Sequence, residues 1–239
     1  MALSTLRSFD QLMTAIHRRW GNDAIVPLGA LNPFSDAIST GFPPLDMALG
    51  AKGVPQHQLT TFIGSGTSGI TSLAHTLVAQ AQAQELIGVV IDPSRTFDPQ
   101  SAQLRGVDLD LLLLVRPVDW MASLSILRDV LDIAVAGCAV LDAAVPDGLD
   151  KEALAALELT LNRISGLLPH STWTVILLLP ADLPYIPDHF AVLRLRCTCH
   201  KVIDSYPPGL QIEAHILKDK FRPAGARPVF DVLNENPSL

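Results

Sequence analysis

The segment from Gly64 to Ser72 has the residue types of a loop that binds phosphate. It follows an apolar run and precedes a helical pattern, which is the context that such a loop requires. In the pattern G-x-x-x-x-G-K-[ST], backbone amides surround the phosphates, the lysine neutralises the outer ones and the hydroxyl holds Mg²⁺. We interpret nine residues as this phosphate loop: Gly64, Ser65, Gly66, Thr67, Ser68, Gly69, Ile70, Thr71 and Ser72.

One position of the phosphate loop departs from that pattern, because Ile70 stands where the lysine is expected. An isoleucine cannot offset the charge of a triphosphate, whereas the amides and the helix N-terminus still attract an anion more weakly. An ordinary glycine-rich turn between a strand and a helix contains the same residues, so this second interpretation stays open. We expect that no cofactor is required, with weak binding of ATP and Mg²⁺ as the most that the loop supports.

The composition restricts the class of protein. With 239 residues, 49% of them hydrophobic and 5% aromatic, the chain is long enough for one helix-covered α/β core. A formal net charge of −7 argues against a protein that holds nucleic acid by itself. The three cysteines are too few for a disulfide framework, and Cys138 lies in an apolar run that suits a buried, reduced thiol. The string from Cys197 to His200 lacks the further ligands that a structural zinc needs.

The N-terminus has no pattern of a secretory signal, and the apolar runs are too short to cross a membrane. We therefore expect a cytoplasmic protein that makes no membrane contact.

Strand and helix patterns alternate along the chain from residue 58. Continuous apolar runs predict strands at 58–63, 86–91, 111–115, 138–142 and 173–179. Between them, helical patterns cover 70–84, 119–135 and 150–167. Four further strands at 191–197, 200–205, 210–217 and 227–233 are separated by turns that contain proline and glycine. The fold class is therefore α/β, with a mainly parallel central sheet covered by helices and with antiparallel C-terminal hairpins.

The N-terminal segment has its own pattern. A capping box at Ser8 and Gln11 and the break at Gly21 predict a helix over 8–20 with one apolar face. A short extended piece follows over 24–29. We divide the chain into an arm of helix and strand at 1–37, which contacts a subunit or partner, and a core domain at 38–239. The predicted contact residues are Phe9, Leu12, Met13, Ile16, Trp20 and Ile25, with Leu6 on the same face.

Short strings in the same order make the chain similar to the bacterial RecA family from about residue 11 to residue 233. They include WGNDAI at 20–25, ISTGFPPLDMALG at 38–50, IDP at 91–93 and ILKDK at 216–220. The second string is specific to that family among folds with a phosphate loop. The resemblance implies a RecA-like core preceded by an arm that joins subunits, and we expect the family's C-terminal domain to be missing.

The resemblance also implies roles for single residues. Asp142, at the end of its strand, would hold Mg²⁺ through water together with Thr71, although a strand-end cap is its plain alternative. Ser94 takes the place of the family's water-activating glutamate, and a hydroxyl cannot act as a carboxylate base. Asp98 matches an adenine-side position but also fits an ordinary turn.

Two lysines match residues that reach the nucleotide of the adjacent subunit in a RecA filament, Lys218 and Lys220. A solvated edge strand protected by charge is the alternative interpretation. The two DNA loops of the family would fall at 143–149 and 180–188, which contain no Lys or Arg, so we expect little direct DNA binding. Arg194 and Arg196 share a strand face, and we interpret them as surface charge.

These departures favour a catalytically inactive accessory protein, and the resemblance alone implies a role in bacterial DNA repair and the SOS response to DNA damage. Its expected partner is RecA or another RecA-fold subunit, with translesion polymerase components as a further candidate and a homo-oligomer as a possible assembly. It would be similar in kind to the ImuA-type relatives of RecA. Two alternatives stay open: a divergent ATPase that takes charge from Lys52 or from a neighbour's lysines, and a self-assembling structural protein.

Overall fold

A computed structural model describes residues 2–21, 36–143, 148–183 and 190–234. Two compact units make up the chain, residues 1–35 and residues 36–239. The predicted extended piece at 24–29 and its residue Ile25 lie outside the described residues, as do parts of both predicted DNA loops. None of the helices in the described ranges is both long and apolar enough to span a membrane.

The first unit contains helix α1 (Ala2–Trp20). The predicted start at Ser8 is wrong, because residues 2–7 contain no glycine or proline and the helix extends through them. Its predicted end is confirmed: the amide of Gly21, which has a φ of 92°, donates to the carbonyl oxygen of His17 at 3.0 Å. On this helix Phe9, Leu12 and Trp20 are exposed, whereas Met13 and Ile16 are half-buried.

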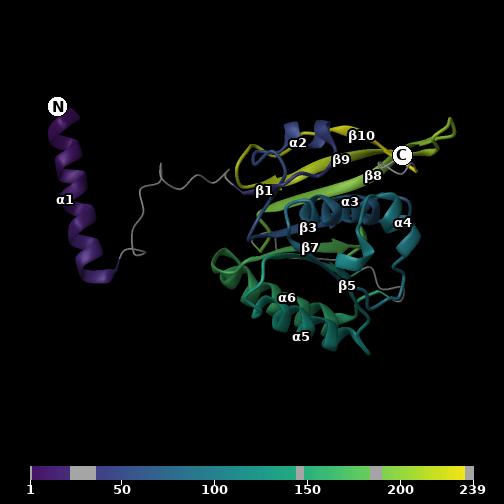
Figure 1. Ribbon diagram of the computed structural model, residues 1–239, viewed down its shortest axis with the longest axis horizontal. Coiled ribbons are helices and arrows are strands. Elements are labelled where there is room, and N and C mark those ends of the chain that lie inside the picture. Colours follow the sequence, from purple (N-terminus) through teal and green to yellow (C-terminus); the bar gives the residue numbers. More distant parts are fainter. Residues whose placement is uncertain (1, 22–35, 144–147, 184–189, 235–239) are drawn as a thin grey trace. The chain divides into compact units, whose positions relative to one another are not determined.

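The second unit is built on an eight-stranded sheet with the order β10-β9-β8-β3-β7-β6-β4-β5 (Figure 1). Its strands are β3 (Leu59–Ile63), β4 (Ile87–Ile91), β5 (Leu112–Val115), β6 (Gly137–Asp142), β7 (Trp173–Leu179), β8 (Leu193–Ile203), β9 (Gly209–Asp219) and β10 (Val229–Leu233). All pairs from β8 to β5 are parallel, whereas β8, β9 and β10 pair antiparallel. The predicted fold class is confirmed.

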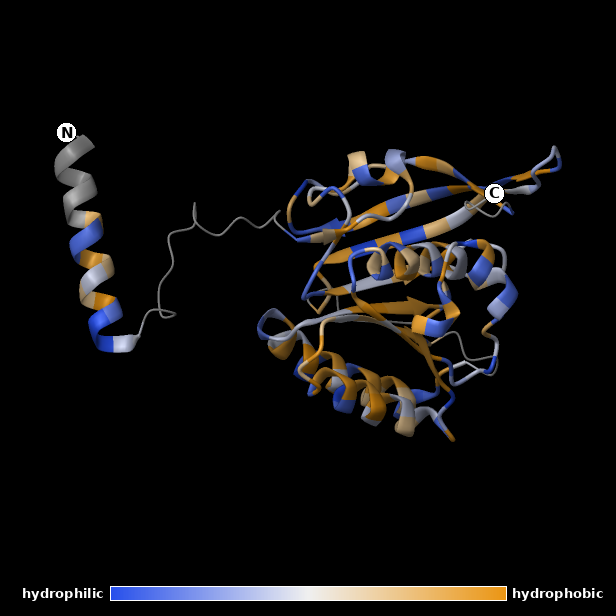
Figure 2. Ribbon diagram, in the orientation of Figure 1, coloured by the Kyte–Doolittle hydropathy of each residue, from blue (hydrophilic) through white to orange (hydrophobic). Residues whose placement is uncertain are grey.

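Helices cover both faces of this sheet. One face packs against α2 (Pro43–Ala48), α3 (Ile70–Gln82) and α4 (Pro99–Leu104). The other face packs against α5 (Trp120–Leu131) and α6 (Lys151–Leu167). Figure 2 shows that hydrophobic residues follow the central strands and the helices beside them. The hydrophobic side chains on both faces form the two apolar clusters that hold the sheet in place.

Several details differ from the sequence-based prediction. β8 is one strand where we predicted two, because a shift of register between Cys199 and Lys201 keeps the pairing with β9 continuous. Helix α4, capped by Asp98, was not predicted, and neither was α2. The short pair β1 (Ala37–Ile38) and β2 (Val54–Pro55) was also missed, since two-residue strands leave no periodic pattern.

The string ISTG…LD forms a hydrogen-bonded turn, which we call the Asp46 clasp. The carboxylate of Asp46 accepts hydrogen bonds from the hydroxyl of Ser39 at 2.6 Å and from the hydroxyl of Thr40 at 2.7 Å. It also accepts one from the amide of Thr40 at 2.9 Å. Beyond the clasp, the amide of Gly50 donates to the carboxylate of Asp219. The residues of the string ISTGFPPLDMALG therefore hold the first part of the core domain in place through these hydrogen bonds.

The three thiols are all free. Cys138 is fully buried as predicted, and burial raises the pKa of its thiol to about 12. Burial likewise raises the pKa of Cys197 to about 12. Within the described ranges, no three His, Cys, Asp or Glu side chains are grouped so as to hold a metal ion.

Candidate nucleotide site

The phosphate loop connects β3 to α3, and its backbone requires glycine at two positions at least. A Cβ on Gly64 would lie 2.3 Å from the hydroxyl oxygen of Ser68, which is too close for any side chain. Gly69 has a φ of 81°, and a Cβ there would lie 2.7 Å from the side chain of Ile212. The tight path of the loop is therefore set by contacts within this protein.

The backbone amides of residues 66–72 form a row that we call the amide nest. In the described parts of the chain, no hydrogen-bond acceptor is found for the backbone amides of residues 66–72. The amide of Leu73 is the first to bond back, to the carbonyl oxygen of Gly69 at 2.9 Å. Residues 65–67 are exposed to solvent. Such a row of free amides at the start of a 13-residue helix attracts an anion.

Ile70 occupies the lysine position with its side chain buried. Only 6% of its surface is exposed, and it belongs to the apolar cluster beneath α3. It also lies against Gly64, since a Cβ on that glycine would come within 2.9 Å of the isoleucine side chain. The residue is therefore part of the hydrophobic core, and it supplies no charge toward the amide nest.

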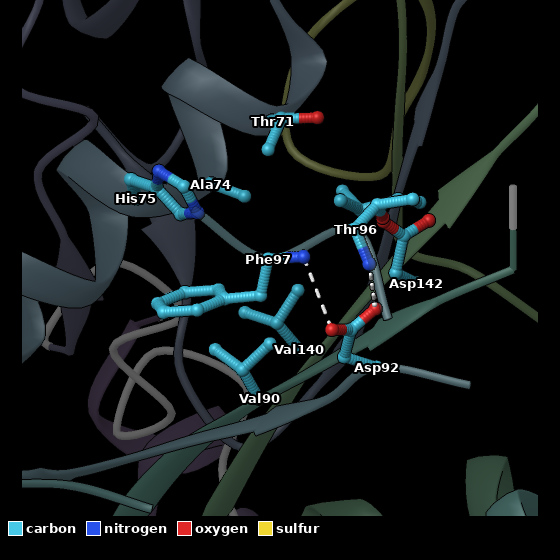
Figure 3. A pocket seen from close by; sticks show the side chains of 10 residues that line it. Thr71, Ala74, His75, Val90, Asp92, Thr96, Phe97, Val140 and Asp142 are labelled. Carbon is cyan, nitrogen blue, oxygen red and sulfur yellow. Dashed lines mark hydrogen bonds between the residues drawn. The ribbon is translucent and has the colours of Figure 1, made fainter. Parts of the chain in front are cut away.

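Thr71 and Asp142 line one pocket, with a cavity volume of about 20 Å³ (Figure 3). Thr71 comes from the first turn of α3, and Asp142 ends β6, whose strand brings the carboxylate to the carboxyl end of the sheet. The cavity holds about one water molecule. A hydroxyl and a carboxylate suit Mg²⁺, but two protein donors hold it only when phosphate oxygens complete the shell. The pair therefore fits a magnesium ion that arrives with a nucleotide.

Asp92 also lines this pocket, is almost fully buried and stabilises the fold. Its carboxylate accepts hydrogen bonds from the amides of Thr96 and Phe97, both at 3.0 Å (Figure 3). The guanidinium of Arg116 lies 3.8 Å away. These contacts fix the loop that follows β4 and contains Ser94, which is half-buried.

His75, one turn after Thr71 on α3, is a buried neutral base. Burial lowers the pKa of its imidazole to about 4, Arg105 lowers it further, and Asp98 partly opposes both effects. Its ring meets Phe97 edge-on, with 5.2 Å between the ring centroids. Within the described residues its Nδ1 has no hydrogen-bond partner. The wall of the pocket beside the threonine is therefore uncharged at neutral pH.

Comparison with known proteins agrees with this geometry. The family model of the RecA N-terminal domain matches residues 7–150, which is more than half of the chain. The chain belongs to the RecA family. The Protein RecA of Rhodopirellula baltica is 44% identical over 103 residues, covering 43% of this chain and 28% of that relative.

Two further relatives give the same result. The Protein RecA of Clostridium acetobutylicum is 38% identical over 113 residues, covering 47% of this chain and 32% of the relative. That of Aquifex pyrophilus is 30% identical over 138 residues, covering 57% and 40%. The chain thus spans roughly a third of the length of the RecA proteins that it matches.

The other predicted site residues of this RecA-family chain lie in three places. Asp98 is exposed and caps α4 by accepting a hydrogen bond from the amide of Gln100 at 3.0 Å. Lys218 lies on β9, and the exposed Lys220 directly follows that strand. Trp20 and the other described arm residues belong to the first unit.

Among the residues that line the pocket, sequence reasoning missed the ionisable side chains of His75 and Asp92. A histidine four residues after Thr71 on an otherwise apolar helix face was the available signal for the first. For Asp92 the signal was its position directly after an apolar strand, which predicts a place at the carboxyl edge of the sheet.

Proposed function

We propose that this chain is a RecA-family accessory protein that acts in bacterial DNA repair and the DNA damage response by binding other proteins, without hydrolysing ATP. The burial of Ile70 is the observation that carries the proposal. The backbone of a phosphate loop is retained, while the residue that should neutralise the phosphates packs into the core. Its relatives are named RecA, which supports the link to recombination and repair.

Hydrolysis needs a second group that activates water, and Ser94 offers only a hydroxyl two residues after Asp92. Thr71 and Asp142 still line one pocket, so weak binding of ATP with Mg²⁺ is compatible with the proposal. A phosphate loop without a lysine, and a serine at the position of the water-activating glutamate, together favour binding without turnover.

The apolar edge of the sheet supports the proposed binding of a protein. β5 is the last strand of the sheet, and Leu113 on it is 59% exposed. The segments on either side of this strand add further exposed apolar side chains, namely Leu109, Leu111, Val118 and Met121. An exposed edge strand can pair with a strand of another chain, while apolar side chains beside it add contact area. We propose that RecA or another RecA-fold subunit docks here, with a translesion polymerase component as the other candidate.

The arm supports the same proposal. α1 exposes Phe9, Leu12 and Trp20, and an isolated helix of this length is marginal in water without a surface to cover its apolar face. A subunit with such an arm and no working phosphate loop would join a RecA filament at one end and change further growth there.

The test is the growth of RecA filaments on single-stranded DNA with three proteins: the full-length chain, a deletion of residues 1–22, and Leu113→Asp. We expect the full-length chain to alter filament growth and both variants to lose most of that effect. Asp110→Lys, an exposed change near the same edge that leaves the apolar side chains in place, is the control. Equal effects of all the proteins, or no effect of any, would overturn the proposal.

A further inference from the structure

Four cationic side chains gather where β8 begins and β9 ends, in a chain whose acidic residues outnumber its basic ones by 24 to 17. Arg194 and Arg196 are two residues apart on β8, so their side chains share one face of the sheet. Lys218 lies directly opposite Arg194 in the antiparallel register of β8 and β9. Lys220 directly follows Asp219, the last residue of β9, and its amide donates to the carbonyl oxygen of Val192.

This face of β8 differs from its other face. Leu193, Leu195 and Cys197 point into the apolar cluster under α3. The arginines between them therefore point to the opposite face, where the apolar cluster formed with α5 and α6 includes no residue of β8. On this side the beginning of β8 is polar and partly accessible to solvent, since Arg194 is half-buried and Arg196 is exposed.

Like charges held this close destabilise a sheet. Opposed residues on paired strands have Cβ atoms about 5 Å apart, and like charges in that position are unfavourable. Burial and the nearby Arg196 lower the pKa of Arg194. Burial, Lys220 and Arg194 in turn lower the pKa of Lys218. An anion bound at this place would offset the repulsion between these like charges.

A cavity of about 50 Å³ lies beside these side chains. Arg194 and Arg196 line it together with Ile63, which ends β3, and Leu179, which ends β7. Its remaining wall is Pro180, Ala181 and Leu183. The amide of Ala181 donates to the hydroxyl of Ser65 at 2.9 Å, so this wall is tied to the first part of the phosphate loop. The cavity is large enough for one small oxyanion group.

Thr61 adds a second polar group on the same side. It is the register partner of Arg194 across β3 and β8, and residues paired in this way share a face. The residue is 2% exposed, and its hydroxyl has no hydrogen-bond partner within the described residues.

We propose that Arg194 and Arg196, supported by Lys218, form a binding site for a single phosphate group within one chain. Two guanidinium groups match the geometry of phosphate oxygens, and their summed charge suits a dianion better than a carboxylate. The site is separate from the amide nest of the phosphate loop. It also differs from the role that the resemblance implies for the lysines, because it needs no neighbouring subunit. The inference does not depend on the proposed function.

The test is a titration of the full chain, labelled with ¹⁵N, using inorganic phosphate, AMP and adenosine. Arginine side-chain Nε–H signals and backbone amide signals report separately on the two anion sites. We expect phosphate and AMP to shift the Nε–H signals of Arg194 and Arg196 at lower concentration than the amides of residues 66–72. Adenosine should shift neither arginine. Equal affinities for phosphate and AMP would identify free phosphate as the ligand, and tighter AMP binding a nucleotide.

The variants sharpen this test. The pair Arg194→Gln and Arg196→Gln should weaken phosphate binding about tenfold or more, because each charge-assisted contact is strong. Arg227→Gln, on the exposed segment before β10, is the matched control and should bind like the parent chain. If the double variant fails to fold, Arg194→Lys with Arg196→Lys keeps the charge and should still bind several-fold more weakly.

Three outcomes would overturn the site. The first is the absence of arginine shifts, and the second is unchanged affinity in the arginine variants. The third is an affinity for phosphate that rises with protein concentration, since that would place the phosphate between two subunits.

Discussion

The Asp46 clasp and the phosphate loop are both polar turns beside the sheet, but they differ in whether their hydrogen-bonding groups are paired within the chain. In the clasp, the Asp46 carboxylate is satisfied by Ser39 and Thr40 of the same chain. In the phosphate loop, the amides of residues 66–72 find no acceptor within the described residues. Polar groups that stabilise a fold are paired internally, whereas groups that face outward are available to a ligand. The first turn supports the core, and the second leaves its backbone amides available to an anion.

The largest expected effect is on the clasp. Asp46→Ala removes three hydrogen bonds to a carboxylate. The buried hydroxyl of Thr40 then keeps only its longer contacts with the backbone of Phe42, at 3.2 and 3.3 Å. We expect the free energy of unfolding to fall by about 4 kcal/mol, as measured by urea denaturation. The control Asp110→Ala removes an exposed carboxylate and should change it by less than about 0.5 kcal/mol. Similar small losses in both variants would show that the clasp does not stabilise the core.

The second effect depends on pH and concerns His75 beside the phosphate loop. The pKa of His75 is about 4 in the folded chain and 6.5 in the unfolded one, so the unfolded chain takes up the proton first. The contribution of His75 to the free energy of unfolding is therefore complete above about pH 6.5, and it declines by about 3 kcal/mol as the pH falls to 4. Denaturation at several pH values should show this slope, and His75→Leu should flatten it. The exposed His170→Ala is the control; a slope that His75→Leu leaves unchanged would contradict the assignment.

The third effect would convert the phosphate loop toward a charged site. Ile70→Lys places an amine where a buried apolar side chain packs, so we expect a loss of about 2 kcal/mol in stability, limited because lysine can extend to solvent. ATP binding should improve more than hydrolysis, which we expect to be undetectable in the parent chain. Ile70→Met is the control for packing. An ATPase rate in the parent chain that Asp142→Asn abolishes would refute the accessory role.

The smallest effect on stability is at Thr71, which is exposed on the first turn of α3. Thr71→Ala should change the free energy of unfolding by less than about 0.5 kcal/mol. Introduced together with Ile70→Lys, it should remove the Mg²⁺ dependence of ATP binding, since the hydroxyl is one of two protein donors in the pocket. Calorimetry with and without Mg²⁺ checks this. A Mg²⁺ dependence that survives in the double variant would place the ion elsewhere.

The sheet and its helices could be predicted from sequence because buried parallel strands and amphipathic helices leave long periodic patterns. The joining of 191–197 and 200–205 into β8 could not, since the shift of register that unites them depends on the pairing with β9. The phosphate loop was visible as a motif, but the burial of Ile70 is a property of packing. The same holds for Arg194: its place on a strand face was predicted, whereas the cavity beside it requires residues from β3 and β7.

The bond between Gly50 and Asp219 joins residues 169 positions apart, and the guanidinium of Arg222 donates to the carbonyl oxygens of Met47 and Ala48. Contacts of such sequence separation form slowly, because a long loop must close first. During synthesis, the carbonyl groups of α2 therefore gain this hydrogen-bond donor only after Arg222, which follows β9, has left the ribosome. β3 likewise cannot pair with β8, one of its two neighbours in the sheet, until β8 has been synthesised. The core domain accordingly completes its fold only after β9 and the residues that follow it have emerged, and nascent chains that expose fewer than about 220 residues outside the ribosome should remain sensitive to protease.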